Sequence, residues 1–151
     1  MKERTLLFLK PEGLIKDLAG DILNRMRRID DVQMIGAKLV AVTEGLAAEH
    51  YIEHKDKPFY PRLIGHLTGQ YHHGINRVLA FVFEGEDIIA QVRKIVGATM
   101  PEDAHPRSIR GAYGRICKDT GLIENVVHAS ANPTDAAREI ALWFRPEELM
   151  K

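Results

Sequence analysis

The sequence predicts an α+β fold, a ferredoxin-like α/β sandwich in which a four-stranded antiparallel sheet carries helices packed on one face. Two observations support this prediction. Apolar, strand-like segments alternate with amphipathic, helix-like segments in the order β-α-β-(α)-β-α-β-α, which is a βαββαβ core with extra helices and a long loop before the last strand. A length of 151 residues fits one domain, so we expect residues 1–151 to form a single unit.

The first strand and helix follow directly from the hydrophobic pattern. Residues 4–10 form a compact apolar run that is closed by Pro11, which predicts a buried strand. Apolar side chains then recur at helical spacing from Leu18 to Ile29, and we expect Asp17 to cap this helix. Residues 32–42 are rich in Val, Ile and Leu and predict the second strand.

The middle of the chain predicts two extra helices and a third strand. Thr43 is a suitable N-cap for a helix over about 44–54, and a short helix follows through residues 63–67. Residues 69–76 are polar and carry Gly and His, so we expect a loop there. The apolar run at 77–83 predicts the third strand.

The last part combines a long loop with the final strand and helix. An amphipathic helix is expected over 87–96, with Gly97 as its C-terminal stop. Residues 98–124 show little periodicity, and a loop of this length in a small domain usually has a functional or interface role. A short strand is expected at Val126-Val127, and Asn132-Pro133 predicts the cap and first position of a helix that ends near Phe144.

Charge and cysteine content narrow the classes of function. The 21 basic residues balance the 21 acidic ones, so nothing in the net charge points to nucleic acid or an anionic membrane as a required partner. Cys117 is the only cysteine, which precludes an intrachain disulfide and fits a cytoplasmic protein. No secretory signal and no apolar stretch of roughly 20 residues is present, so we expect no membrane association.

Seven histidines invite a metal-binding interpretation. His50 and His54 lie four residues apart on an expected helix, but no Glu follows His50 as in zinc proteases and no cysteine cluster completes a site. We therefore expect these two as surface residues on a polar helix face. His72-His73 is expected to be a loop feature, and a metal-storage role for these four histidines stays a minor alternative.

His128 differs from the other histidines in its flanking residues. It ends the apolar pair Val126-Val127 and is followed by Ala129-Ser130-Ala131, so small side chains leave room for a ligand at the ring. The alternative is a hydrogen-bonded core histidine, and spacing alone does not decide between the two.

The long loop carries groups that suit phosphate. Arginine matches phosphate oxygens with a bidentate fork, so a basic cluster in this loop could form an anion site. Its candidate members are Arg93, Arg107 and Arg110, with hydroxyls from Thr99, Ser108 and Thr120 and an ammonium from Lys10 at the end of the first strand. Because no P-loop motif is present, such a site would depend on side chains. The alternative is a solvated loop surface.

These scattered features resemble one family, the nucleoside diphosphate kinases, with motifs in the family's order over nearly the whole chain. The matching segments are Thr5–Gly13, Glu49–Tyr51 with Lys55–Tyr60, Phe83–Gly85 with Arg93, Gly97–Thr99 with Pro101, Ser108–Gly111, Asn125–Ser130 and Glu139–Leu149. The resemblance implies a kinase that moves the γ-phosphate of a nucleoside triphosphate, mainly ATP, to a nucleoside diphosphate by a ping-pong mechanism.

The resemblance also implies catalytic roles. His128 would be the nucleophile that becomes a phosphohistidine, Glu139 would orient its ring, and Ser130 would support Glu139. Tyr51 would help to position the imidazole, and Lys10 would contact the reacting phosphates. The chemistry agrees, because a neutral imidazole is a nucleophile near pH 7 and phosphoryl transfer mainly needs positioning and positive charge.

The implied nucleotide contacts come from residues around this centre. By role they are Lys10, Arg93, Thr99 and Arg110 for the phosphates, Asn125 and Lys10 for the ribose, and Phe59 with Leu63 for the base. Mg²⁺ would be held mainly by nucleotide phosphates rather than by a protein cage. Stacking on an aromatic ring accepts any base, so the preferred nucleotide stays open.

Two segments are longer than in common members of the family, 69–76 and 114–124. The second lies in the loop that forms subunit contacts in this family, so the expected homo-oligomer could be a hexamer, a tetramer or another assembly. The insertion also leaves open which residue covers the second face of the base. A nucleotide-binding module without turnover is the alternative that these insertions suggest.

Overall fold

The computed structural model describes all residues 1–151 and arranges them around a four-stranded sheet, with a separate two-stranded hairpin. The strands are β1 (Lys2–Leu9), β2 (Gln33–Ala41), β3 (Arg77–Glu86), β4 (Arg115–Ile116), β5 (Ile123–Glu124) and β6 (Val127–Ala129). The helices are α1 (Pro11–Ile15), α2 (Ala19–Met26), α3 (Glu44–His50), α4 (Tyr60–Leu67), α5 (Ile88–Val96), α6 (Ile109–Tyr113) and α7 (Pro133–Trp143), with short 3₁₀ helices at Ile52–His54, Pro101–Asp103 and Pro146–Glu148.

The main sheet has the strand order β2-β3-β1-β6, and every neighbouring pair is antiparallel, which confirms the predicted sheet. β1 is a central strand, and it pairs with β3 from Lys2 opposite Glu86 to Leu9 opposite Leu79. On its other side, Phe8 lies opposite His128 of the short strand β6. The register therefore places His128 beside the buried C-terminal end of β1.

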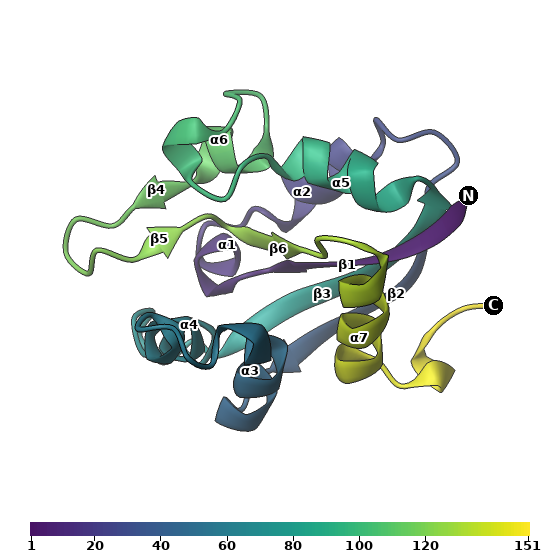
Figure 1. The fold of residues 1–151 in the computed structure, drawn as a ribbon. Coiled ribbons are helices and arrows are strands. Elements are labelled where there is room, and N and C mark those ends of the chain that lie inside the picture. Colours follow the sequence, from purple (N-terminus) through teal and green to yellow (C-terminus); the bar gives the residue numbers. More distant parts are fainter.

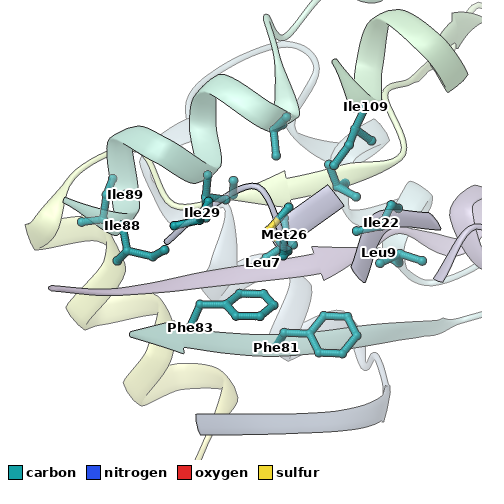
Figure 2. Packing of buried hydrophobic residues seen from close by; sticks show 14 of the residues in the cluster. Leu7, Leu9, Ile22, Met26, Ile29, Phe81, Phe83, Ile88, Ile89 and Ile109 are labelled. Carbon is teal, nitrogen blue, oxygen red and sulfur yellow. The ribbon is translucent and has the colours of Figure 1, made fainter. Parts of the chain in front are cut away.

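One face of the sheet is covered by α2 and α5 (Figure 1). Leu7 and Leu9 of β1 and Phe81 of β3 point into this core, where they meet apolar side chains such as Ile22 of α2 and Ile88 of α5 (Figure 2). All of these side chains are almost fully buried. Burial of this kind contributes roughly 1.5–3 kcal/mol per large side chain and fixes the sheet against these helices.

The two helices of the predicted βαββαβ core, α2 and α5, thus lie on one face, and the second face of the sheet is covered as well. Leu6 and Phe8 of β1 pack into a second apolar core with α3, α4 and α7 on the opposite side of the sheet (Figure 1). Successive side chains of a strand point to opposite faces, so a central strand that is apolar at four successive positions needs cover on both. The extra helices supply that cover.

The caps and ends of the helices agree with the sequence in most places. Thr43 accepts a hydrogen bond from the Leu46 N–H, Asn132 accepts one from the Asp135 N–H, and Gly97 ends α5 with a φ of +91°. Asp17 is not a cap: α2 begins after Leu18, and a separate short helix, α1, precedes it. Asp17 instead has a φ of +54°, a turn conformation that links the two helices.

Two boundaries differ from the expected ones. The helix expected over 44–54 ends at His50 and continues as a 3₁₀ turn. The segment expected to be a structureless loop, 98–124, contains a 3₁₀ helix, α6 and the β4–β5 hairpin. Ser108 caps α6 by accepting the Gly111 N–H, and the hairpin pairs Arg115 with Glu124. These local hydrogen bonds produce elements too short to show a hydrophobic period.

No helix of the chain combines the length and the apolar content that a membrane crossing requires.

Candidate active site

A cleft of about 690 Å³ opens between β6, the α3–α4 region and the β4–β5 hairpin. Ten of the eleven site residues expected from the sequence line it: Lys10, Tyr51, Phe59, Leu63, Arg93, Thr99, Arg110, Asn125, His128 and Glu139. The eleventh, Ser130, lies behind Glu139 and is fully buried. The fold thus brings together side chains from positions 10 to 139 of the chain.

His128 lies on β6 with its two ring nitrogens in different surroundings. Nε2 hydrogen-bonds a carboxylate oxygen of Glu139 at 2.9 Å, and the Ser130 hydroxyl donates to the same oxygen at 2.6 Å. Nδ1 has no hydrogen-bond partner, and the ring lines the cleft. An acceptor at Nε2 fixes the proton there, so Nδ1 keeps its lone pair free on the cleft side. His128 is therefore not the closed core histidine that spacing alone allowed.

The His128 ring is held between two aromatic neighbours. The ring of Phe8 stacks on it at a centroid distance of 4.9 Å, because the two residues are opposite each other in the sheet. His50 meets it edge-on at 4.4 Å, and the Trp143 N–H donates to Nδ1 of His50 at 3.1 Å. These contacts leave the imidazole little freedom to turn.

Three basic side chains enter the cleft near His128. Lys10 follows β1 and is buried, and its ammonium donates to the side-chain oxygen of Asn125 at 2.6 Å. The guanidinium of Arg110 donates to the carbonyls of Gly97 and Val127, which holds it beside β6. Its Nε is buried without a partner, which is an unused donor at this position. Arg93 of α5 lies exposed at the rim.

Asn125 links this basic cluster to the next loop. While its side-chain oxygen accepts from Lys10, its side-chain amide donates to the carbonyl of Thr99 at 3.0 Å. Thr99 itself is exposed, so its hydroxyl is accessible from the cleft. Tyr51 is buried along the wall, directly after His50. The polar end of the cleft is thus built from side chains that fix one another.

The other end of the cleft is apolar. Phe59, whose ring is 46% exposed, and the half-buried Leu63 form one wall, and Leu122 and Ile123 of the β4–β5 hairpin also line the cleft. The guanidinium of Arg62 on α4 donates to the carbonyl of Thr120 and so joins the hairpin to the Phe59 side. Sequence reasoning did not identify Leu122 or Ile123, because the hairpin has no periodicity.

Burial and the neighbouring cations change the proton affinities in the cleft. Desolvation, with Lys10 and Arg110 in addition, holds the pKa of His128 well below its ordinary value, so its imidazole is neutral at pH 7. Burial lowers the pKa of Lys10 to about 8 and that of Arg110 to about 10, and it raises the pKa of Glu139. Burial likewise lowers the pKa values of His50 and His66.

These shifts predict an acid-sensitive fold. Three histidines that stay neutral in the folded state gain protons when the chain unfolds, so the free energy of unfolding is highest above pH 6.5 and falls as the pH drops below it. We expect a loss of about 1 kcal/mol per histidine between about pH 6.5 and about pH 5.5. Urea unfolding across this range measures it. His50→Gln should make the slope shallower, and an equal slope in that variant would contradict the assignment.

The expectation that His50 lies on the surface was wrong. His50 is not on a polar surface: it is 2% exposed and lies beside His128. The spacing of Ala47, His50 and Tyr51, which places all three on the inner face of α3, was the signal that could have shown this. His72 belongs to the expected loop but is buried, while His73 is exposed. The four histidines of the metal-storage alternative do not form one cluster.

Three of the proposed phosphate contacts lie elsewhere. Arg107 is exposed outside the cleft, and its carbonyl accepts a hydrogen bond from Arg25. The Ser108 hydroxyl is used to cap α6, and the Thr120 hydroxyl accepts the Leu122 N–H inside the hairpin. Local backbone needs take both hydroxyls, so they are not available to a ligand.

Comparisons with known proteins agree with this arrangement. A profile of the family described as nucleoside diphosphate kinase matches residues 3–149. The nucleoside diphosphate kinase of Thermus thermophilus is 44% identical over 148 residues, which are 98% of this chain and 99% of that protein. That of Thermococcus kodakarensis is 43% identical over 149 residues, 99% of this chain and 80% of that protein.

Solved structures show the same fold. The enzyme from Borrelia burgdorferi, a transition-state mimic with bound vanadate and ADP, has a TM-score of 0.87 and 35% identity and covers 99% of this chain and 91% of that one. The enzyme from Halobacterium salinarum in complex with CDP has a TM-score of 0.86 and 38% identity and covers 100% and 93%. On these grounds the chain belongs to the nucleoside diphosphate kinase family and is a phosphotransferase.

Proposed function

We propose that this protein transfers the γ-phosphate of a nucleoside triphosphate, mainly ATP, to a nucleoside diphosphate through a phosphohistidine on His128. The observation that carries the proposal is the free Nδ1 of a neutral His128 at the basic end of the cleft, with Nε2 held by Glu139. A fixed, neutral ring with one accessible lone pair is the nucleophile that phosphoryl transfer through an intermediate requires.

The proposed reaction needs no proton transfer at the nucleophile. The Nδ1 lone pair attacks the γ-phosphorus, and the bond to the bridging oxygen breaks, so that ADP leaves. The ring then carries positive charge at Nε2–H, beside the carboxylate of Glu139. In the second step, a terminal oxygen of the diphosphate acceptor attacks the phosphorus, the N–P bond breaks and the neutral ring returns. Ping-pong kinetics follow from these two steps.

The basic residues are proposed to hold the phosphates. Lys10, Arg93 and Arg110 provide positive charge around His128, and the Thr99 hydroxyl adds a donor at the rim. Arg110 is already fixed by two backbone carbonyls, so little entropy is lost when its unpaired Nε meets an anion. Asn125 and Lys10 are placed to reach the ribose hydroxyls, and Tyr51 limits the movement of the His128 region.

Mg²⁺ is proposed to enter with the nucleotide. The phosphate end of the cleft is lined by Lys10, Arg93 and Arg110, and its carboxylate, Glu139, is engaged by His128 and Ser130. This donor set suits a cation whose oxygen ligands come from phosphates and water rather than from the protein. When bound, Mg²⁺ neutralises phosphate charge.

The base is proposed to lie between Phe59, with Leu63 alongside, and the apolar side chains of the hairpin, Leu122 and Ile123. We expect Phe59→Ala to raise KM about fivefold to tenfold and to leave kcat nearly unchanged, because stacking contributes about 1 kcal/mol at an exposed edge. Steady-state kinetics with ADP and CDP as acceptors measure this. Tyr71→Ala, outside the cleft, is the control, and a fall in kcat alone would contradict the assignment.

We also propose that the protein is a cytoplasmic homo-oligomer. β2 is an edge strand of the sheet, and its side chains Met34 and Leu39 are more than half exposed, which favours a contact with a second copy. Hexamers, tetramers and other assemblies all use such contacts, and light scattering coupled to size exclusion distinguishes them.

The test of the proposed function is a labelling experiment with γ-labelled ATP. We expect acid-labile, base-stable label on the protein, which added nucleoside diphosphate removes as labelled triphosphate. A chain that binds ATP or ADP but neither takes up nor releases label would instead be a nucleotide-binding module without turnover.

A further inference from the structure

A second group of buried titratable side chains lies behind the cleft, and the kinase reaction does not use it. It consists of Glu12 of α1, His66 of α4, His72 of the 69–76 segment and Glu124 of β5, each at most 5% exposed. Four separate segments of the chain meet here. The two segments that we expect to be longer than in common members of the family, 69–76 and 114–124, contribute His72 and Glu124.

Glu12 is a buried carboxylate that makes no direct ion pair with a lysine or arginine, although the charge of Lys10 lies nearby. One of its oxygens accepts from Nε2 of His66 at 2.5 Å, and the other accepts the N–H of Val126 at 3.0 Å. Burial opposes its ionisation, but the hydrogen bond from His66 and the nearby charge of Lys10 act together against it, so the pKa of Glu12 is lowered to about 2. Burial keeps His66 neutral. A buried carboxylate oxygen beside two imidazoles, with no lysine or arginine in contact, is a suitable place for a cation ligand.

His72 presents an unused ligand atom to the same region. Its Nε2 hydrogen-bonds Glu124 at 3.0 Å, and its Nδ1 is buried with no partner. If Nε2 donates to the carboxylate, Nδ1 carries the lone pair. Metal-binding histidines commonly donate their other ring nitrogen to a carboxylate, which orients the ring and raises its basicity. Glu124 is itself held by Arg115 at 2.6 Å.

We propose that Glu12, His66 and His72 form a Zn²⁺ site, with Glu124 as the carboxylate that orients His72. One ligand atom from each of the three residues lies within 4.8 Å of the other two. Ligand atoms of a tetrahedral zinc are about 3.3 Å apart, so side-chain shifts of about 1 Å close the site. Two imidazole nitrogens and one carboxylate oxygen are a usual zinc set.

The zinc site would connect segments of the chain that also carry residues of the nucleotide cleft. Glu12 lies two residues after Lys10, His66 is on the helix that carries Leu63, and Glu124 directly precedes Asn125. Glu12 also holds the N–H of Val126, whose φ of +76° is a strained conformation for a β-branched residue next to β6. Zn²⁺ would therefore connect segments 69–76 and 114–124 to the start of β6, the strand that carries His128.

For the experiment, the full chain is stripped of metal with EDTA, given ZnCl₂ and dialysed. Elemental analysis then measures the amount of bound Zn²⁺, and competition with a chromogenic chelator measures its affinity. We expect one Zn²⁺ per chain and a higher melting temperature with Zn²⁺. His72→Gln should lose the tightly bound ion, and Glu124→Gln should bind it about 10- to 100-fold more weakly. His73→Asn, at the exposed neighbouring position, is the control and should bind like the unchanged chain.

A second variant separates this site from the active site, where His50, His128 and Glu139 also lie within reach of one ion. His128→Asn should still retain one Zn²⁺. Loss of the ion in His128→Asn with retention in His72→Gln would overturn the proposal, as would failure of the unchanged chain to retain Zn²⁺. Circular dichroism of the metal-free variants checks that each one folds. If His72→Gln does not fold, Glu124→Gln tests the zinc site in its place.

Discussion

Replacing His128 with alanine is expected to abolish both the covalent label from γ-labelled ATP and the transfer of phosphate to a diphosphate acceptor. The loss should be about 10⁴-fold or more, because the reaction then has no nucleophile and the remaining residues only bind. The free Nδ1 at the basic end of the cleft is the atom that the proposal requires. Nucleotide binding should survive, since Phe59, Lys10 and Arg110 are unchanged.

The design of this test needs a histidine that is not in the cleft. His73→Asn serves, because His73 is exposed and Asn tolerates its φ of +54°. That variant should be labelled like the unchanged chain. If His128→Ala is labelled as strongly as His73→Asn, the assignment of His128 as the nucleophile is contradicted.

Glu139→Gln is expected to lower kcat by about 100-fold and to leave KM within a few-fold. The carboxylate accepts from Nε2 of His128 and from Ser130, and it faces the positive charge that forms on the ring during transfer. A neutral amide keeps the size and one oxygen acceptor but loses the negative charge that faces the ring. The nucleotide does not need this group in order to bind.

Ser130→Ala tests the same interaction with a milder change than Glu139→Gln. It removes one hydrogen bond to Glu139 but keeps the carboxylate charge, so its loss in kcat should have the same direction and be smaller. Steady-state and single-turnover kinetics separate chemistry from binding. An unchanged kcat in Glu139→Gln, or a loss that falls entirely on KM, would refute the orienting role.

Much of the fold was predictable because its signals are local. The apolar run at 4–10, the caps Thr43 and Asn132, and the stop at Gly97 each depend on the residue and its close neighbours, and the structure confirms them. The placement of the extra helices on the second face of the sheet was not predicted. Leu6 and Phe8 alternate with Leu7 and Leu9, and that continuous apolar run already required two cores.

The sequence by itself determined the family, the sheet and ten of the side chains that line the cleft, since these depend on residue types in a fixed order. Only the tertiary structure decided which other side chains lie beside them. Pairing of β6 with β1 set His128 on Phe8 and next to His50, and segments 69–76 and 114–124 met through His72 and Glu124. Such contacts join residues more than 50 positions apart. The register of the sheet and the closure of both cores fix them, and no local pattern contains that information.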